Sequence, residues 1–323
     1  MKSTRPHRPS PVAIVLVPLA VALVLTLFAW PNARLEPRDL PVGVAGAPAA
    51  AEALERRLAA REGAFDVHTY SNEANARRAI ESREVYGAFV ATPAGAKVLT
   101  SSAASPAVAQ LLTHSASEGG ESAGAATVPV QDVVAAPPAG AALASSVLPL
   151  VIAGILTGVA AVTLASGGLA RAGLVVAGSV LAGLVATAIV QSWLDVVQGD
   201  WVTNAGVLSL TVLAIASVVA GLEALLGKAG LALAALVMIL IGNPFSGVGT
   251  APEMLPEPVG GIGQLLPPGA GGNLLRSTGF FDGAAAGEHV TVLVVWSLAG
   301  VAALLAAGLR ARRPATSSAP VAA

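Results

Sequence analysis

Six apolar runs constrain the fold of this chain more than any other feature. A helix needs about 20 apolar residues to cross the ~30 Å hydrocarbon core of a bilayer, and each run meets or nearly meets that length. Only 11% of the residues are charged, against about 25% in soluble domains. Lipid-exposed backbone must satisfy its own hydrogen bonds, so the runs predict an α-helical polytopic membrane protein. Its six transmembrane helices, one before and five after a polar segment, are expected at residues 12–30, 147–167, 173–193, 205–226, 229–248 and 290–309.

The basic residues predict the orientation of these helices. Arg171 and Lys228 lie in the loops after the second and fourth helices, whereas the loop between the third and fourth carries Asp195 and Asp200. Lysine and arginine gather on the cytoplasmic side of membrane proteins. Segments 1–11 and 310–323 are therefore expected in the cytoplasm, because they carry Lys2, Arg5, Arg8, Arg310, Arg312 and Arg313. The first run is longer than the 7–15 apolar residues of a signal peptide, which favours a retained anchor over a cleaved one.

Residues 31–146 are predicted to form an extracytoplasmic α/β domain and its linker. Period-two and helical patterns alternate along this segment, which favours a mixed or largely parallel sheet. Ser71 is a candidate N-cap, and the charged positions Arg77, Arg78, Glu81 and Arg83 are interpreted as a solvated helix face. His68 and His114 are interpreted as surface histidines. The strands are expected at 41–45, 65–70, 84–91, 97–100 and 128–134, and the helices at 49–61, 72–83 and 106–115.

Polar residues within the apolar runs are functional candidates, because they are costly in lipid. Gln191 and Glu223 are the two found here, and the alternative for each is an interfacial position near a helix end. The absence of a carboxylate near the middle of a run argues against a proton-coupled carrier. Gly154 and Gly158 have the spacing that lets two membrane helices approach closely.

The segment after the fifth run combines many apolar residues with glycines and prolines. Pro244 is expected to end that helix, and a solvated loop has no use for so many apolar side chains. Irregular backbone at membrane depth is tolerated against protein or a water-filled cavity. Residues 249–289 are therefore predicted to be re-entrant or interfacial, with short helices near 253–266 and 270–281. Arg276 is the cation of this segment; it could meet an anionic group or, alternatively, extend to the surface.

Four stretches carry a resemblance to a known family: LPVGVAG (40–46), REVYGAFVATP (83–93), GNPFSG (242–247) and LLPPGAGGNLLRSTGFFDG (265–283). With the one-plus-five pattern, the chain resembles the ABC-2 type permease superfamily. The nearest branch is the bacterial membrane proteins related to the phage infection protein and the nitrosoguanidine-resistance protein. The resemblance implies a homodimer in the bacterial cytoplasmic membrane that exports a hydrophobic or amphipathic substrate, driven by a separate ATPase.

The chain departs from that family in features needed for coupling to an ATPase. It contains no GxxxxGK[ST] phosphate loop and so cannot hydrolyse ATP itself. The loop at 168–172 is short for a coupling helix, and the eleven residues before the first helix leave no room for an amphipathic connecting helix. ATP hydrolysis by a separate subunit is therefore expected, but whether that subunit couples to this chain stays open.

The predicted function is that of a permease subunit in an ABC-2-like exporter. The substrate-path candidates are Gln191, Glu223, Asn243, Pro244 and Arg276. The alternative is a non-transporting membrane protein whose outer domain binds a cell-envelope component or partner. The chain has no HExxH or GxSxG motif and no cysteine, so we expect no catalytic residue, cofactor or metal. A net charge of −1 gives no reason to expect nucleic acid.

Overall fold

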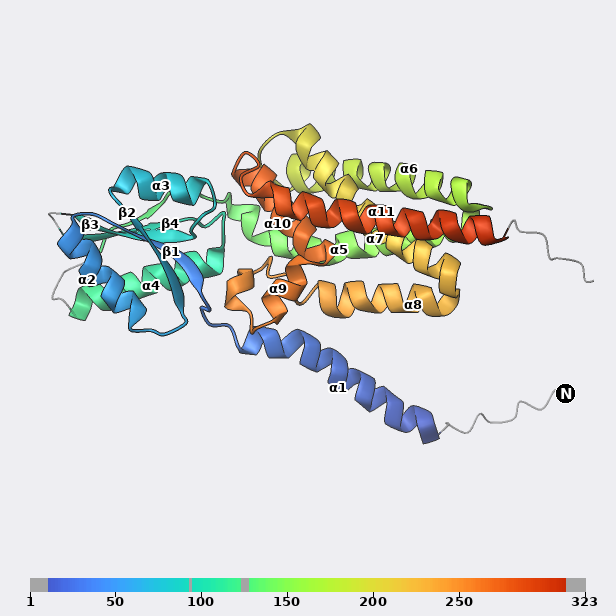
Figure 1. Cartoon of the computed structure of the whole chain (residues 1–323), viewed down its shortest axis with the longest axis horizontal. Helices are drawn as coiled ribbons and strands as arrows, with labels where there is room; N and C mark the ends of the chain where they lie inside the picture. The colour runs from blue at the N-terminus through green and yellow to red at the C-terminus, as the bar shows by residue number, and fades with distance from the viewer. Residues whose placement is uncertain (1–10, 93–94, 123–127, 312–323) are drawn as a thin grey trace, which may run out of the picture.

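The computed structural model describes residues 11–92, 95–122 and 128–311. A small sheet domain lies at one end of a helix bundle, along the long axis of the molecule (Figure 1). We call the end of the bundle next to this sheet the domain end. The basic residues Lys2, Arg5, Arg8, Arg312 and Arg313, on which the predicted orientation partly depends, lie outside the described residues.

The sheet domain is built from five strands in the order β2-β1-β3-β4-β5. Strand β1 pairs in parallel with β2 and β3, β3 pairs antiparallel with β4, and β4 pairs in parallel with β5. The predicted mixed sheet is therefore confirmed. Its elements are β1 (Leu40–Ala45), α2 (Pro48–Ala59), β2 (Phe65–Tyr70), α3 (Glu73–Glu81), β3 (Gly87–Thr92), β4 (Gly95–Thr100), α4 (Pro106–Ser122) and β5 (Val130–Asp132).

Helix α3 differs from its predicted form at its first residue. Its N-cap is Asn72, whose Oδ1 accepts a hydrogen bond from the Asn75 backbone N–H at 2.9 Å. Ser71 was the predicted cap, but its Oγ accepts from the side-chain amide of Asn75 instead. Asn and Ser are both favoured N-caps, so the pattern could not rank two neighbours.

An ionic contact joins α3 to β4 on the surface of the sheet domain. Oε1 of Glu73 lies 2.6 Å from Nζ of Lys97 and 3.4 Å from Nη2 of Arg77. These hydrogen bonds and charges, with Lys97 contributing most, lower the pKa of the Glu73 carboxyl below its usual value.

Five helices of the described residues are long and apolar enough to cross a membrane, which makes this a helical membrane protein. Within the bundle, α6 is continued by the π-helical η2, and η1 precedes α5. The elements are α1 (Pro11–Ala33), η1 (Pro138–Ala142), α5 (Leu143–Leu164), α6 (Gly168–Thr187), η2 (Ala188–Trp193), α7 (Trp201–Leu226) and α11 (Ala286–Ala311). Gly168 already begins α6, so the loop predicted at 168–172 is shorter than expected.

Helix α7 is the centre of the bundle, and it packs against α5, α6 and α11. Glycines make the close approaches possible. A Cβ added to Gly154 would lie 2.7 Å from Ile215, and one added to Gly158 would lie 2.8 Å from a backbone oxygen of α7. A Cβ on Gly300 of α11 would overlap the α7 backbone at Ser217. The predicted close-packing role of the Gly154–Gly158 pair is confirmed.

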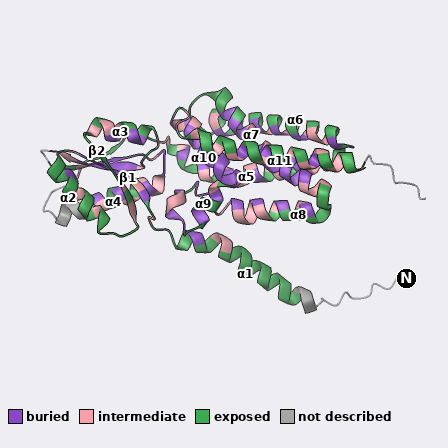
Figure 2. Ribbon diagram, in the orientation of Figure 1, coloured by how far each residue is buried: buried purple, intermediate pink, exposed green. Residues whose placement is uncertain are grey.

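Helix α1 stands apart from the others. Figure 2 shows α7 and α10 largely buried, and α1 exposed along most of its length. The contacts of α1 with the bundle lie near its C-terminal end, where Leu27 joins a cluster with Ile241 and Phe245.

The fifth apolar run forms a shorter helix than predicted. Helix α8 (Lys228–Leu236) has nine residues and the π-helical η3 (Val237–Gly242) adds six, so the helical part ends at Gly242 rather than near residue 248. At 1.5 Å per residue it spans about 22 Å, against about 39 Å for the 26 residues of α7. Pro244 cannot donate a helical hydrogen bond, which is why the run stops there.

Three short helices follow η3 along the chain. They are η4 (Pro252–Met254), α9 (Val259–Gln264) and α10 (Pro267–Phe280), close to the predicted pair. A Cβ on Gly242 would lie 2.7 Å from Pro268, so η3 ends against the start of α10. From there α10 runs antiparallel to α7, from a contact of Gly271 with Thr211 to a hydrogen bond between Thr278 and Asn204 near the domain end. We use the name split span for α8, η3 and α10, which meet where Gly242 contacts Pro268.

Candidate functional site

A cavity of about 290 Å³ lies where the sheet domain meets the bundle. We call it the boundary cavity. The loop between α3 and β3 forms one wall, and η4, α9, α10 and the first turn of α11 form the other. Its polar and charged lining residues are Arg83, Glu84, Tyr86, Glu253, Gln264, Asn273, Glu288 and His289.

Arg83 joins the two halves of the molecule across this cavity. It follows α3 with a φ of +62°, a left-handed conformation that turns the chain toward the bundle. Its Nη1 donates to the backbone oxygen of Asn273 at 3.1 Å and to Oγ of Ser277. Its guanidinium lies 5.4 Å from the ring centre of Phe281. Burial lowers the pKa of Arg83, although a guanidinium remains charged at neutral pH. Its predicted position on a solvated helix face is therefore wrong.

Tyr86 makes a second contact across the boundary. Its hydroxyl donates to Oε2 of Glu253 at 2.8 Å, and its backbone N–H donates to the Pro41 oxygen. Burial, reinforced by the Glu253 carboxylate, raises the pKa of Tyr86 well above its usual value. The pKa of Tyr70, on β2, is also raised by burial and by Glu84.

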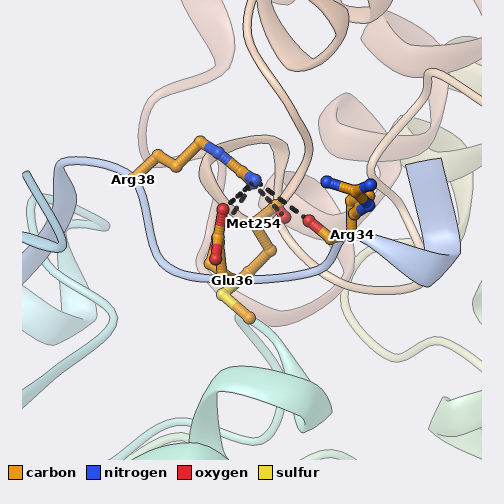
Figure 3. A network of polar contacts seen from close by, with 4 residues as sticks. All are labelled: Arg34, Glu36, Arg38 and Met254. Atoms are coloured by element: carbon orange, nitrogen blue, oxygen red, sulfur yellow. Dashed lines mark hydrogen bonds and ion pairs between the residues drawn. The ribbon is translucent and has the colours of Figure 1, made fainter. Parts of the chain in front are cut away.

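A short strap between α1 and β1 holds the segment that carries Glu253. In Figure 3, Arg38 lies against the backbone of Met254, with its guanidinium 2.5 Å from the Glu36 carboxylate. The backbone N–H of Glu36 donates to the Met254 oxygen, and that of Arg38 to the Glu253 oxygen. These bonds fix η4 to the chain that enters the sheet domain.

Polar side chains behind the cavity form a continuous chain of hydrogen bonds. Nδ2 of Asn273 donates to Oε1 of Gln264 at 2.7 Å, and Nε2 of Gln264 donates to the Ser246 oxygen at 2.8 Å. Arg276 donates to Oδ1 of Asn273 at 3.0 Å and to the Val248 oxygen at 2.6 Å. The network therefore ties α9 and α10 to the segment after η3.

A groove of about 580 Å³ adjoins the boundary cavity, because the two share Pro252, Glu253, Gln264 and Glu288 among their lining residues. Its other walls include the apolar side chains of Leu255, Ile262 and Leu265, the last of which is 60% exposed. A polar space thus continues into an apolar one.

The charge of these two spaces is mainly negative. Seven carboxylate and guanidinium side chains line them: Arg38, Asp39, Arg83, Glu84, Glu253, Glu257 and Glu288. Five are acidic and two are basic, so their formal net charge is −3 at neutral pH. Nδ1 of His289 is buried without a hydrogen-bond partner among the described residues.

The five predicted path residues lie in three separate places. Arg276 is 3% exposed, so it does not extend to the surface as the alternative supposed, and its Nε has no hydrogen-bond partner among the described residues. Asn243 and Pro244 are partly buried at the turn that follows η3, next to the break in the split span. These three residues belong to the same region.

Gln191 lies near the domain end but in a different network. Its Nε2 donates to the Gly199 oxygen and its Oε1 accepts from Nδ2 of Asn204, both at 2.9 Å. Asn204 in turn accepts from Thr278 of α10. Gln191 therefore holds the end of α6 against α7 and α10.

Glu223 lies at the other end of the bundle, 19 residues along α7 from Asn204 and so about 28 Å away. Its Oε2 lies 3.7 Å from Nη1 of Arg171. Arg171 also donates to the Ala165 and Val162 oxygens at the end of α5. The contact joins α6 to α7 far from the boundary cavity.

Most residues of the boundary cavity were missed by the sequence analysis. Tyr86 and Glu253 belong to segments 167 residues apart, and Arg83 contacts Ser277 across 194. One local signal existed: Glu288 and His289 stand together at the start of an apolar helix, where polar residues are costly.

Among the described residues, no group of three or more histidine, aspartate or glutamate side chains could hold a metal ion. No family model, curated protein or solved structure matches the chain. The geometry described above is thus the basis for a functional proposal.

Proposed function

We propose that this chain is the permease subunit of an exporter similar to the ABC-2 type, which moves a hydrophobic or amphipathic substrate outward. In this proposal the sheet domain is extracytoplasmic and both termini are cytoplasmic in a bacterial cell membrane. The split span of α8 and α10 completes the sixth crossing. A homodimer and a separate ATPase subunit are part of the proposal, as the family resemblance implies.

The observation that carries the proposal is the split span. Helix α8 with η3 covers about 22 Å, and α10 continues from a contact with Gly242 toward the domain end. Interrupted helices that meet within the membrane are typical of transporters, whose binding sites lie at such breaks. Asn243 and Pro244 lie at this break, which supports their role in the substrate path.

The boundary cavity and groove support an amphipathic substrate. A polar head group suits the cavity, and an apolar chain suits the wall formed by Leu255, Ile262 and Leu265. Because both spaces lie at the domain end, they are suited to the exit of the path. Binding pockets of this kind combine apolar walls with a few placed polar groups.

The test is ATP-dependent uptake of a fluorescent amphipath into inside-out vesicles from cells that express the chain. Gly242→Leu should abolish the uptake, because the added side chain would separate η3 from Pro268 of α10. Gly206→Leu is the matched control, since a Cβ at Gly206 meets nothing within 4 Å. Mass spectrometry of the purified complex should identify an ATPase.

Two results would refute the proposal. Uptake that is unchanged after ATP depletion would show that transport is not driven by an ATPase. Equal uptake by Gly242→Leu and Gly206→Leu, with both variants present at wild-type levels, would show that the split span is not part of the substrate path.

A hollow of about 690 Å³ on the sheet domain favours the alternative function, binding of a cell-envelope component or partner. It is lined by residues of β4, α4 and β5, including Thr100, Gln110 and Asp132. Deletion of residues 34–144 should then abolish binding of intact cell envelopes while the helices still insert. Retained binding by the deletion variant would exclude this alternative.

A further inference from the structure

We infer that the molecule which occupies the boundary cavity and groove carries a cationic head group on an apolar chain. This inference deepens the proposed function and rests on it for the role of substrate, but the binding it predicts can be measured without transport.

The cations that line the two spaces are already committed to groups of the protein. Arg83 donates to the Asn273 oxygen and to Ser277, and lies over Phe281. Arg38 donates to the Glu36 carboxylate, to backbone oxygens of the strap and to the Met254 oxygen. Neither guanidinium is therefore well placed to neutralise a bound anion.

Three carboxylates remain uncommitted. Within the described part of the chain, the side chains of Asp39, Glu257 and Glu288 form no hydrogen bond or ion pair, and all three are exposed in the lining of the groove. Glu253, between cavity and groove, accepts one hydrogen bond from Tyr86. With a formal net charge of −3 over the lining, a cation gains electrostatic energy here and an anion loses it.

The shape of the site adds an apolar requirement. The groove wall continues from these acids to Ile262 and Leu265, which are 41% and 60% exposed. A second observation points to a ligand at the same place: the buried Nδ1 of His289, in the cavity lining, has no hydrogen-bond partner among the described residues. A small metal ion would leave the apolar groove unused, whereas a cation on an alkyl chain reaches from the cavity into the groove.

Arg276 could have indicated the opposite charge preference. It does not line the cavity or the groove, and it is used to bind Asn273 and the Val248 oxygen. Its guanidinium lies behind the cavity, where it holds α10 to the segment after η3. The anionic group that Arg276 was a candidate to meet therefore gives way, in this inference, to a cationic one.

Trp296 provides a reporter for the test, because its Nε1 donates to the oxygen of Leu265 in the groove wall at 2.8 Å. The other three tryptophans, Trp30, Trp193 and Trp201, are replaced by phenylalanine. The full chain in nanodiscs is titrated at pH 8 with 11-bromoundecyl-trimethylammonium or with 11-bromoundecanoate. Both carry the same chain and the same bromine quencher, and differ in charge.

The cationic probe should quench Trp296 saturably and at lower concentration than the anionic probe. Glu288→Gln should weaken the cation about threefold, the effect of one charge about 6 Å away in a water-like dielectric. Glu257→Gln with Glu288→Gln should weaken it about tenfold. Glu81→Gln is the matched control, because Glu81 is exposed on α3 and lines neither space.

Equal binding of the two probes would overturn the inference. So would a double variant that binds the cation as tightly as Glu81→Gln does. Transport without charge-selective binding would refute this inference alone, and charge-selective binding without transport would refute the proposed function alone.

Discussion

Replacing Arg83 by methionine tests whether one side chain holds the sheet domain on the bundle. Arg83 makes two hydrogen bonds to α10 and a ring contact with Phe281. Methionine has a similar length and cannot make any of the three polar interactions. Arg78→Met is the matched control: Arg78 lies on α3, is exposed, and bonds to Asn75 of the same helix.

The magnitude follows from these contacts. Hydrogen bonds that involve a charged group contribute about 1.5–3 kcal/mol each, and a cation–π contact adds about 1 kcal/mol. Removing the guanidinium also removes the cost of burying its charge, which offsets roughly half of that loss. The domain contact should therefore weaken by about 2–3 kcal/mol, which is a factor of about 30–150 in the opening equilibrium.

Hydrogen–deuterium exchange of the full chain in nanodiscs measures this opening. Amides of residues 273–280 and 84–90 should exchange about 30–150 times faster in Arg83→Met than in Arg78→Met. Peptides from the middle of α7 report whether the bundle itself stays folded. If the two variants exchange within about threefold of each other, Arg83 does not carry the contact and the reasoning is refuted.

Three further predictions concern packing and pH. Gly300→Leu should destabilise the bundle in detergent by about 1–3 kcal/mol through overpacking against α7, whereas Gly287→Leu on the same helix meets open space and should leave the melting temperature unchanged. The pKa of Glu73 is lowered in the folded state, so its stabilising contribution is present above the usual carboxyl pKa of 4.5 and is lost as pH falls below that value. Glu73→Gln should abolish this part of the acid dependence of the melting temperature. An unchanged acid dependence in the variant would contradict the prediction. The pKa of Tyr86 is raised in the folded state, so stability should fall as pH rises above the usual tyrosine pKa of 10.0. The variant Tyr70→Phe keeps Tyr86 as its one tyrosine. Its tyrosinate absorbance should therefore appear together with unfolding, and ionisation of Tyr86 in the folded variant near pH 10 would refute the burial argument.

The strands and long helices were predictable because their patterns are local. The predicted strand at 65–70 has the same bounds as β2, and the last apolar run lies within α11. In each case period-two or helical spacing acts over neighbouring residues. The short helices between Pro252 and Phe280 were predictable for a related reason, because Pro244 and the glycines that follow exclude one continuous helix.

The depth at which α8 ends was not predictable from hydropathy. Residues 243–248 still carry two large apolar side chains, Phe245 and Val248, but they pack against α9 and α10 instead of continuing the helix, and the Ser246 oxygen accepts from the Gln264 amide. Which apolar residues meet lipid and which meet α10 depends on tertiary contacts. Hydropathy counts both alike.

The boundary cavity was not predictable because no part of it is complete in one segment. Arg83 reads as one more charge on an amphipathic helix until its left-handed φ turns it toward Phe281. Arg276 was singled out correctly as unusual, but its partners at Val248 and Asn273 are carbonyl and amide oxygens that no charge pattern indicates.

The split span also has a consequence for how the chain is assembled during synthesis. Residues 40–132 of the sheet domain leave the ribosome before α7 and long before α10, yet α10 is fixed by Arg83 at one end and by Gly242 at the other. Helix α10 is 14 residues long; its partners in the sheet domain, in α5 and in α7 are made before it, whereas α11, which also packs against it, is made after it. It therefore finds the sheet and α7 already made when it is synthesised, and α11 then packs against it from the other side of the sequence. Until its arrival, the polar groups that face it, from Asn204 to the Val248 oxygen, lack their final partners.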